Sequence, residues 1–232
     1  MFVLSPTDLR FPPLDFASPE GLLAMGGDLR AERLLEAYRH GIFPWYNEDQ
    51  PILWWSPDPR AVLFPDKLKI SRSFAKTLRR ATFDVRCDTV FRSVMQACAA
   101  PRKQYPRGGT WITAAMLEAY VHLHELGYAH SVETWRDDSL VGGLYGVAIG
   151  GIFFGESMFS HCADASKVAL THLVGQLKRW NFSVIDCQLP SSHLASLGAE
   201  EIRRHHFLDI LHDALQRPHR PGPWRLEPTR SE

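Results

Sequence analysis

The segment from Gly150 to Gln188 constrains the fold more than any other part of the chain. It opens with a Gly150-Gly151 pair, which is a two-residue turn signal, and continues as a mostly apolar strand over residues 152–159. A helix with apolar residues at helical spacing follows, and Asp164 is expected to cap its first turn. A second short strand is expected over residues 183–188. The segment therefore predicts two neighbouring strands joined by a helix.

Three polar residues interrupt these two apolar strands. Glu156 lies in the first strand, where a carboxylate must reach water or meet a cation because an unpaired buried charge is very costly. Asp186 and Gln188 lie two residues apart in the second strand, so we expect them to project from the same face. The three residues form a candidate polar site. The alternative is that Glu156 is a solvated strand-end residue and Asp186 a turn residue.

Charge is unevenly distributed along a chain whose formal net charge is zero. Between Lys67 and Arg107 there are eleven basic and two acidic residues, a local charge of +9, so the rest of the chain carries −9. Such a block is typical of proteins that bind a polyanion. The alternative is a solvated helix face.

The cysteines and the N-terminus indicate the compartment. The four cysteines show no CxxC pairing and no disulfide spacing, which predicts a reducing environment. The first ten residues lack the basic and apolar regions of a signal peptide. The most apolar run, residues 141–155, is too short to cross a bilayer. We expect a soluble cytoplasmic protein with no membrane segment.

Composition divides the chain into two parts. Residues 1–62 are dense in proline and tryptophan, with one helix expected over residues 31–40, and are interpreted as a small N-terminal α+β domain. Its aromatic residues are expected to form the domain core, although such clusters sometimes expose a ring on which a nucleic-acid base stacks. Residues 63–232 are expected to form the second domain.

The order of elements in the second part predicts its fold. From residue 82 the pattern is strand, helix, helix, three antiparallel strands, helix, strand, helix, with Asp88 expected to cap the first helix and a basic loop expected over residues 100–109. This is the order of the acetyltransferase-type (GNAT) fold, an α+β fold with a mostly antiparallel sheet. In that fold a glycine loop holds coenzyme A through backbone N–H groups. Here the matching junction, residues 160–167, contains no glycine and includes Asp164, which disfavours a coenzyme A donor.

Several motifs resemble those of one known family. They include HGIFPWY at 40–46, LWWSPDPRAVL at 53–63, GTWIT at 109–113, GESMFS at 155–160 and IDCQ at 185–188. These runs are similar to those of the leucyl/phenylalanyl-tRNA–protein transferases, and the resemblance extends from about Gly21 to Phe207. It implies a bacterial enzyme with a small N-terminal domain and a GNAT-like acyltransferase domain.

The resemblance also implies a reaction. Leucine or phenylalanine, and less readily methionine, would move from aminoacyl-tRNA to proteins with N-terminal arginine or lysine, which marks those proteins for degradation by the N-end rule. No metal or cofactor is implied. Two tryptophans, Trp45 and Trp111, match the positions that hold the terminal adenosine of the tRNA.

The remaining site residues follow from the same motifs. Glu156, Asp186 and Gln188 match the reacting centre. Four residues match the pocket for the aminoacyl side chain: Leu144, Phe153, Met158 and Leu173. Leu173 replaces a larger aromatic residue, so the preference between phenylalanine and leucine stays open. Six basic residues are expected to contact the tRNA backbone: Lys67, Lys69, Arg72, Lys76, Arg79 and Arg80.

The reaction requires an α-amine to attack an ester. An α-amino group has a pKa near 8, so roughly a tenth is neutral at pH 7 and no strong base is essential. We expect the Gln188 carbonyl oxygen to align the amine, while Asp186 holds the amide and favours developing positive charge. Glu156 either pairs with the cationic end of the acceptor or orients a backbone group. The proton acceptor is left open between water, a ribose hydroxyl and Asp186.

Two other functions are compatible with parts of the pattern. A non-catalytic tRNA-binding module would keep the basic block and the tryptophans without needing the Asp186 and Gln188 pair. A coenzyme A-dependent N-acyltransferase is disfavoured by the junction that lacks glycine. Transfer of labelled phenylalanine from tRNA to a protein beginning with arginine, without coenzyme A, separates the three functions.

Overall fold

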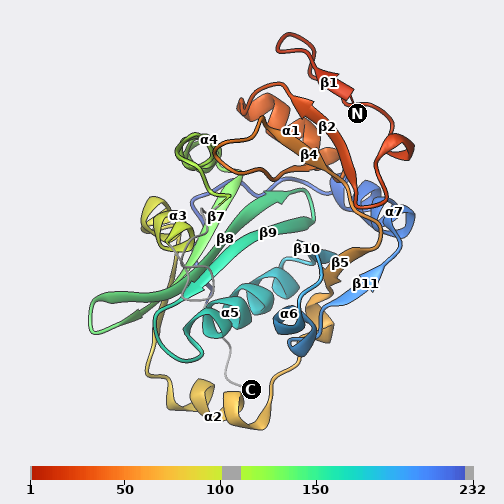
Figure 1. The fold of residues 1–232 in the computed structure, drawn as a ribbon. Coiled ribbons are helices and arrows are strands. Elements are labelled where there is room, and N and C mark those ends of the chain that lie inside the picture. The colour runs from red at the N-terminus through yellow and green to blue at the C-terminus, as the bar shows by residue number, and fades with distance from the viewer. Residues whose placement is uncertain (1, 101–110, 228–232) are drawn as a thin grey trace.

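The computed structural model describes residues 2–100 and 111–227. These residues form two β-sheets, a four-stranded one in the order β1-β2-β4-β3 and a seven-stranded one in the order β11-β5-β10-β9-β8-β7-β6. Figure 1 shows the small sheet at one end of the molecule and the large sheet at its centre. In these described ranges, no helix combines the length and the apolar character needed to cross a membrane.

The small sheet is packed against one helix. A buried face of α1 carries Leu34 and Tyr38, which are both fully buried, and Trp54 of β4 is fully buried in the same core cluster. The elements of this part are β1 (Phe2–Leu4), β2 (Leu22–Gly26), α1 (Ala31–Arg39), β3 (Phe43–Pro44) and β4 (Leu53–Trp55), with a short 3-10 helix at Leu14–Phe16.

The large sheet begins earlier in the chain than the sequence suggests. Strand β5 (Arg60–Leu63) pairs antiparallel with both β10 and β11, so the expected domain boundary at residue 62 falls inside a strand of the large sheet. A 3-10 helix at Pro65–Lys67 follows β5. The division of the chain into domains 1–62 and 63–232 stays a prediction.

The predicted order of elements from residue 82 is present, and the α+β prediction is confirmed. All neighbouring strands of the large sheet are antiparallel except β9 and β10, which are parallel. Its strands are β6 (Asp84–Cys87), β7 (Ala129–Arg136), β8 (Ser139–Ile149), β9 (Ile152–Ser160), β10 (Val184–Gln188) and β11 (Glu200–Ile202). The helices are α2 (Arg72–Arg80), α3 (Phe91–Ala99), α4 (Ala114–Glu125), α5 (Ala165–Arg179), α6 (Ser192–Ser196) and α7 (Arg204–Leu215).

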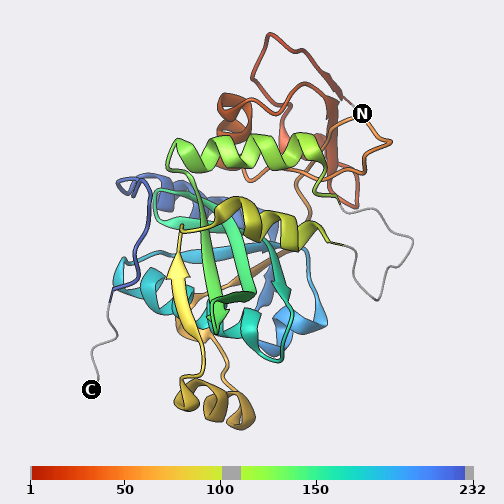
Figure 2. The same cartoon turned by 90° about the vertical axis from the view of Figure 1, so that its left-hand side faces the viewer.

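Helices cover both faces of the large sheet. Helices α3 and α4 lie side by side over one face (Figure 2), and α5 lies against the other (Figure 1). The strand residues alternate between two core clusters accordingly: Ile152 and Phe154 join the cluster of α1, α3 and α4, whereas Phe153 joins that of α5. We call these the α4 face and the α5 face.

The predicted turns and caps are partly confirmed. The turn between β8 and β9 is at Gly150-Gly151, and Gly150 has the positive φ of 56° that glycine tolerates. Asp88 does not cap α3. The backbone N–H groups of Thr89 and Val90 instead donate to the buried carboxylate of Glu133, at 3.0 and 3.3 Å from its Oε1. Most of the predicted basic loop, residues 101–109, lies outside the described residues.

Candidate active site

The two strands predicted to carry the polar site lie side by side. The parallel ladder between β9 and β10 has three residue pairs and ends where Asp186 pairs with Phe154. Beyond this point a side-chain contact joins the strands, because Nε2 of Gln188 donates a hydrogen bond of 3.2 Å to Oε1 of Glu156. The predicted proximity of Glu156, Asp186 and Gln188 is therefore confirmed.

Both strands are irregular at these residues. Tyr145 of β8 pairs with Ser157 and Gly146 with Gly155, so Glu156 is the extra residue of a β-bulge in β9. The pairing of β10 with β5 also shifts between Asp186 and Gln188, and Gln188 has a φ of 56°. A β-bulge bends its strand and redirects a side chain. Glu156 stays on the α4 face with Ile152 and Phe154, and the bulge turns Met158 to the α5 face.

Asp186 is paired with a buried arginine. Oδ1 accepts a hydrogen bond of 2.8 Å from Nε of Arg60 and Oδ2 one of 2.7 Å from Nη2, and both side chains are fully buried. The guanidinium carbon of Arg60 lies 4.8 Å from the ring centroid of Phe43 and 4.7 Å from that of Phe207. This bidentate pair neutralises the charge of Asp186, so the alternative of a turn residue at this position is wrong.

The structure differs from the expected role of Asp186 toward the Gln188 amide. Oδ1 of Asp186 accepts a hydrogen bond from the backbone N–H of Gln188, at 2.9 Å, and the side-chain amide donates to Glu156 instead. Glu156 therefore orients the amide, and Asp186 fixes the backbone of the bulge. Sequence reasoning missed Arg60, although the position of an arginine inside the apolar run after LWWSPDP was a signal.

The Glu156 carboxylate accepts hydrogen bonds from three neutral side chains. Tyr38 of α1 donates a hydrogen bond of 2.8 Å to its Oε1, and Tyr120 of α4 donates one of 3.3 Å to its Oε2. The two phenolic hydroxyls are also hydrogen-bonded to each other. Within the described part of the chain, no lysine or arginine forms an ion pair with this carboxylate. Glu156 therefore has no cation partner in these residues, and the partly exposed group accepts hydrogen bonds from two phenols and one amide.

The surroundings of Glu156 change its acidity. Burial raises the pKa of Glu156 to about 8, and the negative charge of Asp186 adds to this effect, whereas the hydrogen bonds from Tyr38 and Tyr120 lower the pKa. Burial also raises the pKa of both tyrosines, so their hydroxyls stay protonated. A carboxyl group with a pKa near neutrality can both accept and release a proton under physiological conditions.

The four residues expected to form the aminoacyl pocket come together on the α5 face. Leu144, Phe153 and Leu173 belong to one buried cluster, and Met158 packs against it. The ring of Phe153 lies over Gly146, where a Cβ atom would be 2.6 Å from the ring. The three clustered side chains are at most 3% exposed, so an incoming side chain must displace part of this cluster. The cluster and the Glu156 carboxylate lie on opposite faces.

The two tryptophans predicted to bind the terminal adenosine lie in two segments that are joined by a side-chain contact. Trp45 is 41% exposed, and its ring meets that of Trp55 edge-on at 5.6 Å between centroids. Trp111 lies just before α4 and is partly buried against the core. The hydroxyls of Tyr46 and Thr113, which are close in sequence to these tryptophans, are 3.5 Å apart. Trp55 was missed because a second ring beneath an exposed one has no sequence signal of its own.

The predicted basic residues are exposed around α2. In residues 2–100 and 111–227, none of the four on the helix forms an ion pair, whereas Lys67 is 2.6 Å from Glu200, and Lys69 is exposed. Those four are Arg72, Lys76, Arg79 and Arg80. Three further members of the basic block, Arg102, Lys103 and Arg107, lie outside the described residues.

The helix junction that carries a phosphate loop in GNAT enzymes is occupied by side chains. Asp164 precedes α5 with a φ of 67° but does not cap it, because its carboxylate accepts from Thr77 at 3.0 Å and from Lys167 at 3.0 Å. The hydroxyl of Ser160 instead accepts from the N–H of Ser166 at 3.2 Å. A carboxylate beside this helix terminus repels a phosphate.

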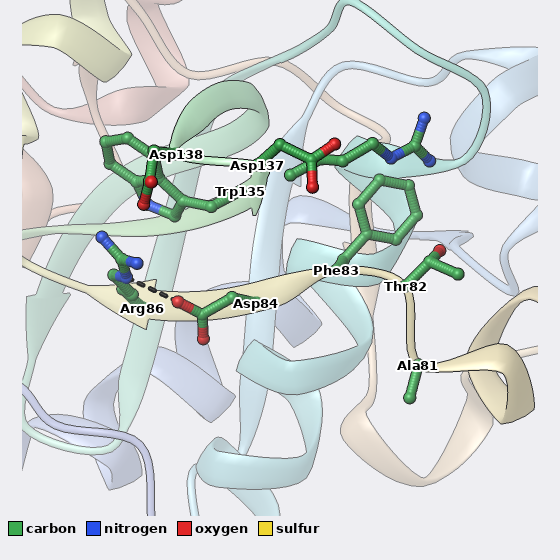
Figure 3. Close-up of a pocket in the computed structure, with 9 residues that line it drawn as sticks. Ala81, Thr82, Phe83, Asp84, Arg86, Trp135, Asp137 and Asp138 are labelled. Atoms are coloured by element: carbon green, nitrogen blue, oxygen red, sulfur yellow. Dashed lines mark hydrogen bonds and ion pairs between the residues drawn. The ribbon is translucent and has the colours of Figure 1, made fainter.

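A cavity of about 470 Å³ lies far from the reacting residues, at the β6 edge beside the turn between β7 and β8. Figure 3 shows Phe83 and Trp135 on its walls, with Arg86 paired to Asp84. It contains none of the predicted site residues. Among residues 2–100 and 111–227, no three His, Cys, Asp or Glu side chains come together as around a metal ion.

Comparisons with known proteins identify relatives along nearly the whole chain. The family model "Leucyl/phenylalanyl-tRNA protein transferase" matches residues 62–212, and the model of that family's N-terminal domain matches residues 27–58. Leucyl/phenylalanyl-tRNA–protein transferase from Thiobacillus denitrificans is 58% identical over 219 residues, which cover 94% of this chain and 95% of the relative. The protein of the same name from Nitrosospira multiformis is 57% identical over 220 residues, 94% of each chain.

Likeness to solved structures is weaker. A GCN5-related N-acetyltransferase from Kribbella flavida is 11% identical, with a TM-score of 0.36 over 72% of this chain and 58% of that one. This value is too low to carry an assignment, which rests on the sequence relatives. With the family model covering more than half of its length, the chain belongs to the leucyl/phenylalanyl-tRNA–protein transferase family and is an aminoacyltransferase.

Proposed function

We propose that the protein transfers leucine or phenylalanine, and less readily methionine, from aminoacyl-tRNA to the α-amine of proteins that begin with arginine or lysine. In the cytoplasm this transfer marks the acceptor for degradation by the N-end rule. Family membership supports the reaction class. The observation that carries the site is the hydrogen bond from Gln188 to Glu156 at the end of the β9–β10 ladder.

This hydrogen bond fixes the orientation of the Gln188 amide. Its NH₂ group donates to Glu156, so the carbonyl oxygen Oε1 is turned to another direction and can accept a hydrogen bond from the acceptor amine. Aligning the amine with the ester converts an encounter of two molecules into a reaction of positioned groups, which contributes much of the rate in such transfers.

The proton released by the amine needs an acceptor. The amine nitrogen forms a bond to the ester carbonyl carbon, the bond from that carbon to the ribose oxygen breaks, and the ribose oxygen takes up a proton. Asp186 is unsuited to relay this proton because Arg60 occupies both of its oxygens. Glu156 is better suited, since its pKa of about 8 matches that of an α-amine.

Different parts of the substrates would lie on the two faces of the sheet. The ester would lie where β9 and β10 part, with the amine on the α4 face beside Gln188 and the aminoacyl side chain among Leu144, Phe153 and Met158 on the α5 face. An apolar cluster accepts hydrocarbon side chains but discriminates weakly between those of similar size. Leucine and phenylalanine are such side chains.

The tRNA would be held away from the chemistry. The unpaired cations of α2 suit the phosphate backbone, whose contacts weaken as salt is added. The half-exposed ring of Trp45, supported by Trp55, suits stacking of an unpaired base such as the terminal adenosine, with Trp111 near it.

The proposal is tested by Gln188→Ala. Single-turnover transfer from phenylalanyl-tRNA to a protein that begins with arginine, without coenzyme A, should fall by about a hundredfold because the amine is no longer aligned. Leu189→Ala, which alters an exposed neighbour on the same strand end, is the matched control and should transfer normally. Filter binding of the tRNA should be unchanged in both variants. Transfer by Gln188→Ala at the wild-type rate contradicts the assignment of the site.

A further inference from the structure

The chain beyond α7 returns across the large sheet as a segment without helix or strand, residues 217–227, which we call the C-terminal strap. Figure 2 shows it leaving α7 and descending along the edge of the molecule. Most of its residues are exposed, but Trp224 is only 4% exposed. A large aromatic side chain buried in an irregular segment contributes a large apolar area to whatever it covers.

Polar contacts fix Trp224 at the start of β7. Its backbone N–H donates to Oδ2 of the buried Asp88 at 2.5 Å, and its indole Nε1 donates to the carbonyl oxygen of Arg220 at 3.0 Å. The indole is stacked on His130, with ring centroids 3.6 Å apart and planes 7° apart. Oδ2 of Asp88 also contacts Nδ1 of His130 at 2.9 Å, so one carboxylate holds both members of the stack.

The buried side of Trp224 faces the residues proposed to receive the aminoacyl side chain. Trp224 belongs to the same core cluster as Leu144, Phe153 and Leu173, and its ring centroid is 6.0 Å from that of Phe153. Phe153 in turn lies over Gly146, where the absence of a side chain leaves space for the ring. Phe153 therefore has the indole of Trp224 as a direct neighbour within the cluster proposed to receive the aminoacyl side chain.

We propose that Trp224 is a positioning residue that limits the depth of the aminoacyl pocket by blocking the retreat of Phe153. The proposal rests on the proposed function, since it takes Phe153 as a wall of that pocket. Leu144, Phe153 and Leu173 are at most 3% exposed, so a donor side chain makes room by pushing them aside. Protein interiors are close-packed, and a rigid, stacked indole resists this displacement more than a flexible aliphatic side chain.

Through Trp224, the strap would therefore influence which aminoacyl side chains the pocket accepts. A bulkier donor side chain requires Phe153 to move further toward Trp224, whereas leucine requires less movement. Replacing the indole by a smaller group leaves a space into which Phe153 can retreat. Donors larger than phenylalanine should then gain relative to leucine.

The test compares donors within each variant. Transfer is measured as kcat/KM for leucyl-tRNA, phenylalanyl-tRNA and tRNA charged with para-methylphenylalanine. Trp224→Leu should raise the ratio of para-methylphenylalanine to leucine by about tenfold, the size of effect that one methylene group produces in an apolar pocket. Trp224→Phe, which keeps an aromatic ring, should raise it less. The ratio does not depend on the folded fraction, because both donors meet the same enzyme.

Trp180→Leu is the matched control. Trp180 contacts the Trp224 ring edge-on at 4.9 Å and donates from Nε1 to Glu227 of the strap at 2.9 Å, but it is not among the rings that contact Phe153. This variant loosens the strap without changing what lies behind Phe153. The donor ratio should stay at the wild-type value even where the melting temperature falls.

Three further outcomes decide against the proposal. If Phe153→Ala changes the donor ratio and Trp224→Leu does not, the pocket stands and the role of Trp224 is overturned. If neither variant changes the ratio while transfer persists, Phe153 is not a pocket wall, and that part of the proposed function fails with it. A change in Trp180→Leu equal to that in Trp224→Leu shows a general effect of strap loosening and also overturns the proposal.

Discussion

Asp186 and Glu156 lie on neighbouring parallel strands, yet their carboxylates are accommodated in different ways. Asp186 is fully buried and accepts two hydrogen bonds from the guanidinium of Arg60. Glu156 is partly accessible and accepts from two phenols and an amide. One carboxylate is paired with a full opposite charge, and the hydrogen bonds that the other accepts come from neutral donors.

This difference separates a structural group from a reactive one. A bidentate ion pair with both partners buried acts as a structural element, because removal of either partner leaves an uncompensated charge inside the protein. Hydrogen bonds from neutral donors offset burial less completely, and the pKa of Glu156 is raised to about 8. The ion pair of Asp186 and Arg60 is therefore suited to stabilising the fold, and the pair of Glu156 and Gln188 is suited to proton transfer.

The largest expected effect comes from breaking the ion pair. Asp186→Asn leaves the Arg60 guanidinium buried without its counter-charge, and we expect the free energy of unfolding to fall by about 3–5 kcal/mol. Urea denaturation at pH 7 measures this change. The double variant Arg60→Met/Asp186→Leu is the control, because two apolar groups remove both charges, and it should recover most of the loss. A single variant as stable as the wild type would show that the pair is not a stability element.

A smaller effect is expected at Glu156, and it depends on pH. The unfolded chain loses this proton near pH 4.5, whereas the folded protein keeps it until about pH 8, so stability from this group is lost as pH rises through that window. Relative to Glu156→Gln, the wild type should lose about 2–4 kcal/mol between pH 5 and 8, a range reduced from the full shift because the residue is partly exposed. Urea titrations of both proteins at several pH values measure the difference, and a difference that does not vary with pH contradicts the account.

Sequence patterns predict the polar residues of this site but not the side chains that contact them. The apolar strands, the Gly150-Gly151 turn and the spacing of Asp186 and Gln188 place three polar residues together, as found. Their partners could not be predicted in this way. Arg60 and Tyr38 come from segments more than a hundred residues away in sequence, and periodicity within a segment carries no information about such pairs.

Backbone irregularities account for other differences. A strict alternation along β9 would put Glu156 and Met158 on the same face, but the bulge at Glu156 separates them. Asp88 is a residue type that often caps helices, yet it lies in a bend with a φ of 55°. Its carboxylate accepts a hydrogen bond from the backbone of Trp224 in the strap. Trp224 was missed because a proline- and arginine-rich tail has no periodicity that indicates burial.

We assign Asp186 to stabilising the fold and Glu156 to proton transfer. This assignment is tested most directly by the transfer rate per folded molecule. Single-turnover transfer from phenylalanyl-tRNA is measured for Glu156→Gln and Asp186→Asn, with the folded fraction of each taken from its denaturation curve. Glu156→Gln should stay folded and transfer about tenfold to a hundredfold more slowly, since it loses the proton acceptor. Asp186→Asn should transfer close to the wild-type rate per folded molecule. Full transfer by Glu156→Gln, together with a slow but fully folded Asp186→Asn, would contradict the account.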